Sequence, residues 1–242
     1  MSENKLSKYL LYAIGEIVLV VIGILIALSI NNRNEYQKTR KTALAYLNSL
    51  QGEFKSNLVL LDSTIQEAQE LSDGSVNMRI LFNPQVLDTV SEERIGQAFG
   101  ELNSEAIYRP SNGVLLEIIS SGNLKILESE LLKQHLASFE KKVERLQVQE
   151  EEVLRLRNEM SLFVRQKGSI AASTSLDLSA EVGANIIKND SNKALFESKY
   201  FMNTIIFYGL VQQAAIYSYY VPLKNEIEEI IRLIEEEIQS HS

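Results

Sequence analysis

Few side chains in this 242-residue sequence are of the types that catalyse reactions or bind metals. The chain has no cysteine and only two histidines, His135 and His241. It therefore offers no thiol nucleophile, no thiolate zinc site and at most one interior histidine for a triad. His135 lies beside an apolar helical seam, and no cluster of carboxylates completes a site around it. We expect no catalytic constellation, no metal and no cofactor, and hence no enzyme.

One carboxylate has an unusual setting, because Glu16 lies inside the apolar run LLYAIGEIVLVVIGILIALSI of residues 10–30. A charge inside a bilayer costs about 3 kcal/mol unless it is paired, protonated or close to the interface. At helical spacing Glu16 shares a stripe with Val20, Gly23 and Ala27, and the Gly23-x-x-x-Ala27 pattern lets two helices approach closely. The stripe predicts a helix interface within the membrane. The alternative is that Glu16 bends toward the N-terminal interface.

The apolar run has the length of a membrane-spanning helix. Of its 21 residues 17 are apolar, and at 1.5 Å per residue it spans about 30 Å, the thickness of the hydrocarbon core. We therefore expect a short tail over residues 1–9, one transmembrane helix over 10–30 and a folded body over 31–242. The alternative is a secretory signal cleaved near Ala27-Leu28-Ser29, which the length of the run disfavours.

Charge is distributed unevenly along the chain. Residues 1–41 carry six basic and three acidic side chains, a balance of +3, and the remaining residues carry 18 basic and 29 acidic ones, a balance of −11. An acidic body argues against a nucleic-acid partner, which needs a concentrated basic face. A basic collar beside an apolar run is typical of a membrane boundary. Two basic residues precede the run and four follow it. By the positive-inside rule this difference weakly favours a cytoplasmic body, but it does not decide the orientation.

Two blocks of the sequence resemble a known family. The first is KYLLYAIGEIVLVVIGILIALSINNRNE, from Lys8 to Glu35, and the second joins Tyr108-Arg109-Pro110 to LEIISSGNL, residues 116–124. Both are similar to recurring patches of an uncharacterised bacterial family of single-anchor membrane proteins, a domain of unknown function. The resemblance implies an inner-membrane protein with a short N-terminus inside the cell and a helical body outside it, in the periplasm. It implies no activity.

The body reads as mainly helical. Apolar residues recur every three or four positions in three stretches, which predict long helices over residues 33–71, 129–166 and 193–239. Asp73-Gly74 should end the first helix, and Pro222 should kink or divide the last. Shorter helices are expected over 92–102 and 111–121. Residues 168–192 are rich in Ser, Asn and Gly and read as a long connection.

The 24 residues between Lys199 and Lys224 contain no charged side chain, which raises the question of a second membrane span. Their asparagine, threonine, glutamine and aromatic residues favour a buried bundle helix instead.

The second of these patches, residues 108–124, also has a simple structural interpretation. Ser111 should cap the short helix that follows it, and Gly122 should close that helix in the left-handed conformation. The alternative is a ligand-binding role for Tyr108, Ser120 or Ser121.

Together these features predict an all-α protein in which one N-terminal transmembrane helix precedes an elongated antiparallel bundle of long helices. The leading functional hypothesis is a membrane-anchored interaction or scaffold module. Its expected partners are the lipid bilayer and, through the transmembrane helix, a second copy or another membrane protein. An alternative is an extracytoplasmic ligand sensor of the four-helix type that signals through its anchor. A third hypothesis makes Glu16 part of an ion-driven membrane machine.

Overall fold

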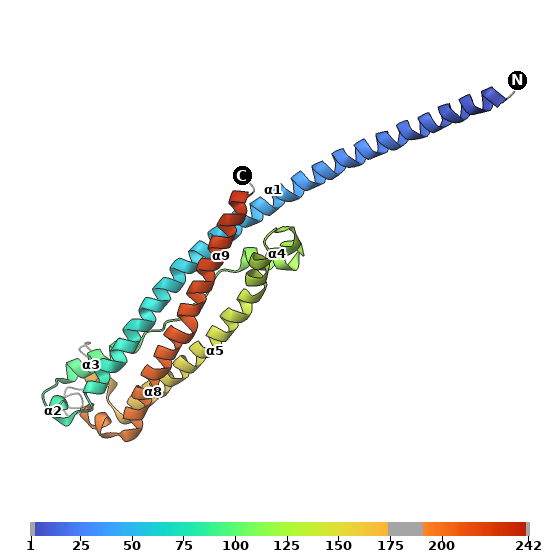
Figure 1. The fold of residues 1–242 in the computed structure, drawn as a ribbon. Helices are drawn as coiled ribbons and strands as arrows, with labels where there is room; N and C mark the ends of the chain where they lie inside the picture. Colours follow the sequence, from blue (N-terminus) through green and yellow to red (C-terminus); the bar gives the residue numbers. More distant parts are fainter. Residues whose placement is uncertain (1–2, 174–190, 241–242) are drawn as a thin grey trace.

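The protein is described by a computed structural model that covers residues 3–173 and 191–240, and all regular elements in these ranges are helices (Figure 1). One long N-terminal helix leads into an elongated bundle, as the sequence predicted. The elements are α1 (Glu3–Ile80), α2 (Pro84–Leu87), α3 (Glu92–Glu101), α4 (Gly113–Ser120), η1 (Asn123–Ile126), α5 (Glu130–Lys167), α6 (Ile170–Ser173), η3 (Lys193–Glu197), α8 (Lys199–Ala215), the π-helical turn η4 (Ile216–Tyr220) and α9 (Val221–Ser240).

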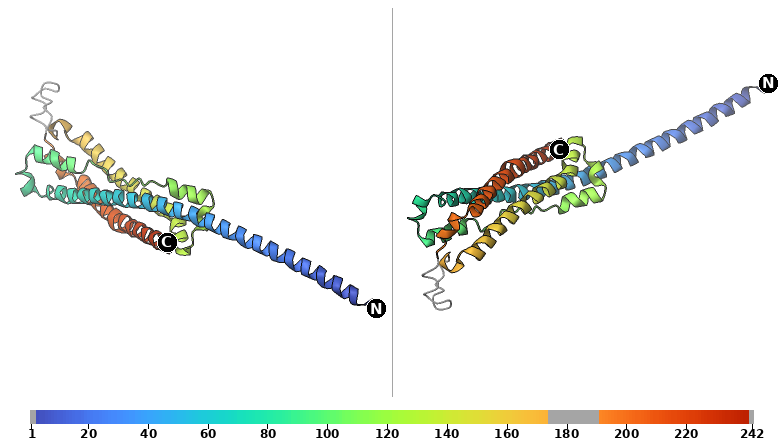
Figure 2. Two further views of the ribbon diagram at one scale, coloured as in Figure 1. Left: turned by 90° about the horizontal axis from the view of Figure 1, so that it is seen from above. Right: turned by 90° about the horizontal axis from the view of Figure 1, so that it is seen from below.

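Helix α1 has 78 residues and is therefore about 120 Å long. Its first half projects from the bundle and its second half forms one wall of it (Figure 2). The predicted end at Asp73-Gly74 is wrong, because the helix continues to Ile80. A side chain at Gly74 would bring its Cβ within 3.1 Å of the Leu102 Cδ2 atom and 3.3 Å of the Glu101 Cβ atom. Gly74 thus permits a close approach of the segment that ends α3, and does not break α1.

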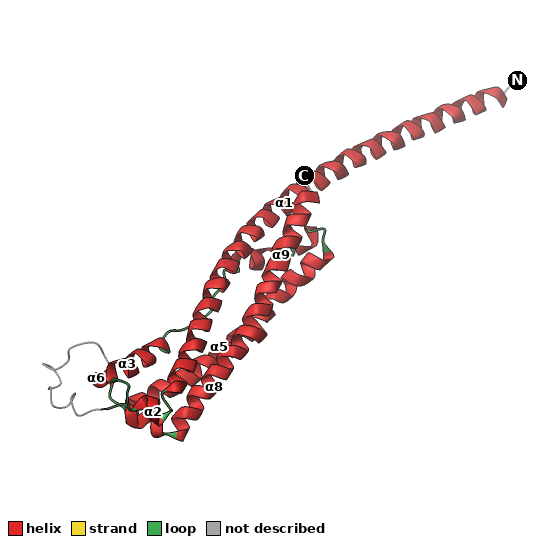
Figure 3. Ribbon diagram, turned by 60° about the vertical axis from the view of Figure 1, so that its left-hand side comes forward, coloured by secondary structure: helices red, strands yellow, loops and turns green. Residues whose placement is uncertain are grey.

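Three long helical segments build the bundle (Figure 3). Helix α5 runs in the same direction as α1, and the segment α8–η4–α9 returns in the opposite direction and contacts both. Buried side chains recur along α1 and α5 at the predicted spacing, and the rings of Phe54 and Phe139 meet edge to face with centroids 5.0 Å apart. Burial of each such large apolar side chain contributes about 1.5–3 kcal/mol.

An extended segment, residues 103–112, passes between α1 and α5 and returns the chain from the end farthest from the N-terminus. The Asn57 side chain of α1 fixes it, since Nδ2 donates to the Ser111 carbonyl at 2.6 Å and Oδ1 accepts from the Ser111 N–H at 2.9 Å. The Tyr108 hydroxyl donates to the Asn57 carbonyl at 3.3 Å. The body thus consists of three long helical segments and this extended segment, which takes the place of a fourth helix. We call residues 103–112 the strap.

The last helical segment differs from the prediction in its internal structure. It begins with η3, and α8 then starts behind Ser198, whose hydroxyl accepts from the Phe201 N–H at 3.3 Å. The π-helical turn η4 divides α8 from α9 just before Pro222, so the predicted division is present. Pro222 lacks an N–H, and its ring crowds the carbonyl four residues earlier. A wider turn relieves that crowding.

The short helices α3 and α4 and the start of α5 lie close to their predicted bounds. Ser129 caps α5 through a hydrogen bond from the Leu132 N–H at 3.1 Å. The prediction that Ser111 caps α4 is wrong: Asn112 holds the N-cap position without a side-chain bond, and the Glu53 carboxylate of α1 accepts from the first N–H groups instead. Gly122 has φ of 69°, which confirms its left-handed conformation. The predicted connection covers residues 168–192, and residues 174–190 of it lie outside the part of the chain that the structure describes.

Candidate functional site

The apolar run forms the exposed half of α1. By length and composition this is one helix that is able to cross a membrane, with a mean hydropathy of 2.8 in its most apolar window and none of that window buried. Its large side chains from Tyr9 to Ile30 are between 46% and 79% exposed. A leader sequence near the N-terminus passes the same test of length and composition.

The predicted interface residues Glu16, Val20, Gly23 and Ala27 all lie in this exposed half of α1. Their spacing within a continuous helix brings them to one face. Around Gly23 no atom lies within 4 Å of the position of a Cβ atom, and within the described ranges no ion pair joins Glu16 to another side chain. The stripe is thus available to a second helix.

The second predicted patch is not one site. Tyr108 is fully buried in the strap between α1 and α5, whereas Ser120 and Ser121 end α4. The Ser120 hydroxyl donates to the Glu117 carbonyl at 3.3 Å and the Ser121 hydroxyl to the Ile118 carbonyl at 3.4 Å. These serines satisfy carbonyls at the end of their own helix, which is a structural role.

A buried carboxylate that the sequence did not reveal lies behind Tyr108. Glu150 of α5 is 2% exposed and accepts from the Tyr108 N–H at 2.7 Å and from the Tyr220 hydroxyl of η4 at 2.9 Å. Arg109 forms an ion pair with its other oxygen at 2.9 Å. The Tyr220 hydroxyl also lies 3.0 Å from the Ala106 carbonyl. Glu150 thus ties the strap, α5 and η4 together.

Burial raises the pKa of both tyrosines in this cluster well above the ordinary value. For Tyr220 the negative charge of Glu150 and the hydrogen bond to it raise the pKa further. Both phenols therefore stay protonated at neutral pH, and Tyr220 acts as a hydrogen-bond donor to Glu150. The arrangement satisfies buried polar groups of three elements.

Three other glutamates bind main-chain N–H groups in the same way. Glu53 accepts from Val114 and Leu115 at 3.0 Å each. Glu237 of α9 is 5% exposed and accepts from the N–H groups of residues 128 and 129, at 2.7 and 3.0 Å. Glu92 of α3 accepts from the Asn192 N–H at 3.0 Å. The acidic composition of the body thus serves partly to hold its connections against the long helices.

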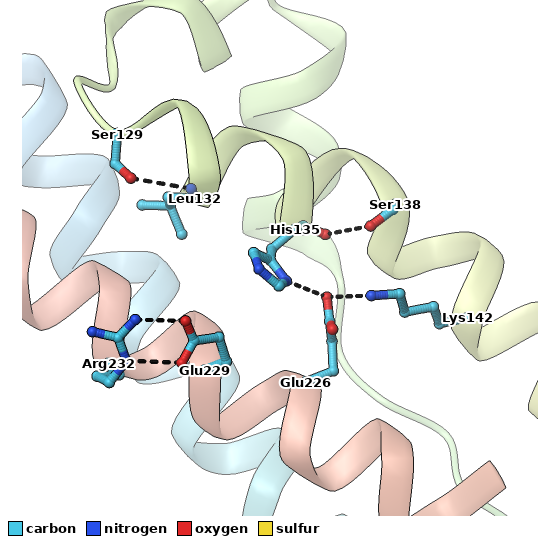
Figure 4. A network of polar contacts seen from close by, with 8 residues as sticks. All are labelled: Ser129, Leu132, His135, Ser138, Lys142, Glu226, Glu229 and Arg232. Atoms are coloured by element: carbon cyan, nitrogen blue, oxygen red, sulfur yellow. Dashed lines mark hydrogen bonds and ion pairs between the residues drawn. The ribbon is translucent and has the colours of Figure 1, made fainter. Parts of the chain in front are cut away.

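His135 belongs to a small ionic cluster between α5 and α9 (Figure 4). Its Nδ1 atom lies 2.7 Å from the Glu226 Oε1 atom, and Lys142 Nζ lies 2.5 Å from the same oxygen. On α9 an adjacent pair joins Arg232 to Glu229. No group of three or more His, Cys, Asp or Glu residues able to hold a metal ion occurs in the described ranges. This cluster joins two helices and carries no recognisable chemistry.

A cavity of about 440 Å³ lies at the end of the bundle farthest from the N-terminus. Its apolar walls come from α1, α3, α5, α6 and α8, and the polar residues that line it include Arg157 and Arg165. Arg157 already pairs with Glu105 at 2.7 Å and donates to the Asn103 carbonyl at 3.0 Å. The volume falls in the range of small-molecule sites. The apolar periodicity of the individual helices did not predict it, because the cavity depends on how their ends meet.

Comparison with known proteins identifies one family. A family model described as a family of unknown function (DUF6090) matches residues 16–182, which is more than two thirds of the chain. No curated protein and no solved structure matches the chain. The match begins within the apolar run and continues past the end of α5, so it includes the stripe from Glu16 to Ala27, the strap and Glu150.

Proposed function

The chain belongs to this family of unknown function, and from that premise we propose that it is a membrane-anchored helical interaction module. One observation carries the proposal: the exposed apolar half of α1 continues without interruption into a wall of the bundle. An exposed surface of this size is what a membrane segment needs and what a water-soluble protein avoids. The acidic, helical body would then present its surfaces to partners while α1 holds it in place.

A stalk separates the apolar run from the bundle, which supports an anchor. Residues 31–39 are exposed on α1, and the first buried side chain is that of Ala43. Twelve helical residues measure about 18 Å, enough to cross the headgroup layer. Among the basic side chains that follow the run, Arg33 lies about 5 Å beyond its end along the helix, at the depth of the lipid phosphates.

We place the protein in the bacterial inner membrane as a single-pass protein with its body in the periplasm, an orientation that follows from the family resemblance. The test fuses, after Ser242, one reporter enzyme that works only outside the cytoplasm and a matched one that works only inside it. Activity of the first alone supports the proposal, and activity of the second alone reverses the orientation. An N-terminal epitope tag shows whether the anchor is retained: its loss from the mature protein would identify a cleaved signal and refute the anchor.

Within the membrane, the stripe of Glu16, Val20, Gly23 and Ala27 is the proposed contact with a second copy or another membrane protein. Replacing Gly23 and Ala27 with isoleucine blocks close approach of the helices. We expect smaller assemblies in detergent. An unchanged size would contradict this contact.

The cavity at the far end of the bundle favours a second candidate function, ligand sensing. Gly100→Leu would fill the cavity, since Gly100 lines it with no atom within 4 Å of a new Cβ atom. Gly52→Leu on the exposed side of α1 is the matched control. A small metabolite that raises the melting temperature of the wild-type chain and of the Gly52 variant, but not of the Gly100 variant, would support sensing. The absence of any stabilising metabolite favours the interaction module alone.

A further inference from the structure

Helix α8 and the start of η4 carry a largely apolar stripe on the exposed side of this helical segment. Tyr200, Phe207, Leu210 and Tyr217 are 53%, 49%, 55% and 65% exposed, and Asn203 and Ala214 between them are also exposed. We call these six residues the α8 stripe. They follow one another at intervals of three, four, three, four and three residues, which is the seam of a helix that packs against another helix.

The sequence around the α8 stripe differs in charge from the rest of the body, although Arg155 and Glu159 of α5 lie beside the start of the stripe. No charged residue occurs from Tyr200 to Leu223, although the sequence as a whole has 23% charged residues and a net charge of −8. A helix with one buried face normally has charged residues on the other face. The opposite side of α8 is already buried, with Ile205, Tyr208 and Gln212 in the core. The outward side is thus largely exposed, whereas Tyr200 at its start contacts α5, since its hydroxyl donates to Glu159 and its ring lies 5.5 Å from that of Phe163.

We propose that the α8 stripe is the surface through which two copies of this chain pair in parallel above the membrane. A second copy suits the stripe because it carries no charge, whereas an acidic body repels itself elsewhere. Copies held by the same anchor also present the stripe at the same height and in the same direction. A two-fold axis perpendicular to the membrane then brings each stripe residue opposite its own copy.

The size of the α8 stripe shows why the anchor matters to this pairing. From Tyr200 to Tyr217 the stripe is about 25 Å long. One helix of that length buries less than the roughly 800 Å² that each partner contributes to a standard stable interface. Confinement to one membrane raises the effective concentration of the second copy and offsets this shortfall. The strength of the pairing therefore rests on the proposed function, whereas the existence of the surface does not.

The absence of cysteine makes a direct test possible. Single Asn203→Cys and Ala214→Cys variants of the full chain are oxidised in native membranes. Parallel pairing predicts a disulfide-linked dimer of twice the chain mass at both positions. The control is Ser56→Cys on the exposed side of α1, which should stay monomeric. Dimer at only one stripe position, equal dimer at Ser56→Cys, no dimer, or a product with a different protein would each overturn the proposal.

A second variant separates specific pairing from chance collisions. Leu210→Glu places two like charges opposite each other and should lower the yield of the Ala214→Cys dimer at least about tenfold. Leu131→Glu on α5, at a leucine that is 47% exposed, is the matched control and should leave the yield unchanged. Membrane fractionation of each variant reports the anchor independently. A chain found in the soluble fraction would refute the anchor, whereas an anchored chain without a specific dimer would refute the pairing.

Discussion

At Glu150 one buried carboxylate accepts hydrogen bonds from the strap and from η4, so its loss would affect contacts on several elements at once. Glu150→Gln keeps the shape but replaces one oxygen with an NH₂ group that faces other donors. Hydrogen bonds to a charged group contribute about 1.5–3 kcal/mol. We expect a loss of about 2–3 kcal/mol in the free energy of unfolding, measured by urea denaturation followed by circular dichroism. The exposed neighbour Glu151 is the control, and an equal effect of Glu151→Gln would contradict this assignment.

Tyr208 and Tyr220 are both buried, yet their hydroxyl groups have different surroundings. The Tyr220 hydroxyl bonds to Glu150, whereas the Tyr208 hydroxyl has no hydrogen-bond partner within the described part of the chain. A buried polar group without a partner costs about 1–3 kcal/mol. Tyr220→Phe should therefore lower the melting temperature, and Tyr208→Phe should leave it unchanged or raise it. A drop of equal size in both variants would show that the Tyr208 hydroxyl has a partner in solution.

At the scale of elements, the contact between α1 and α8 depends on a glycine. A Cβ atom at Gly209 would lie 2.5 Å from Ser75 Oγ and 3.4 Å from Ser75 Cβ. Gly209→Ala should therefore destabilise the bundle by about 1–3 kcal/mol through overpacking. Ser75→Ala removes the clashing oxygen, and the double variant should recover most of the lost stability. Additive losses in the thermal melts of the single and double variants would contradict this close approach.

The long helices were predictable because each needs only a local apolar periodicity, as α5 shows with Leu132, Leu136 and Phe139. Features that depend on a distant partner were not predictable. Gly74 looked like a helix end, because the sequence does not show that Leu102 packs against it. Ser111 looked like a cap, because nothing local indicates that Glu53 takes that role.

The candidate sites, too, are predictable where they depend on local spacing and not where they depend on a distant partner. The anchor stripe is visible from spacing alone, since Glu16, Gly23 and Ala27 lie on one continuous helix. Glu150 was one acidic residue within a charged run, and only the fold places it beside Tyr108 and Tyr220. The sequence did not predict the α8 stripe for another reason. A stretch without charged residues has the pattern of a helix that is buried on all sides.

At the scale of the whole molecule, the buried tyrosines link the stability of the core to pH. Burial raises the pKa of Tyr208 to about 12 and raises the pKa values of Tyr108 and Tyr220 further. In the unfolded chain a tyrosine loses its proton near pH 10. Above about pH 10 the unfolded state therefore binds fewer protons than the folded state, and the free energy of unfolding falls as pH rises. Below about pH 10 this contribution is fully present.

We therefore expect stability to be nearly constant between about pH 8 and pH 9.5 and to fall steeply above about pH 10, as urea denaturation at a series of pH values will show. Each buried phenol contributes up to one proton to the slope, so Tyr208→Phe should reduce this alkaline slope by about one proton. Tyr217→Phe is the control, because it removes the same hydroxyl group at a position that is 65% exposed. A slope that Tyr208→Phe leaves unchanged would mean that water reaches this phenol, and that the core between α1 and α8 is looser than the packing at Gly209 indicates.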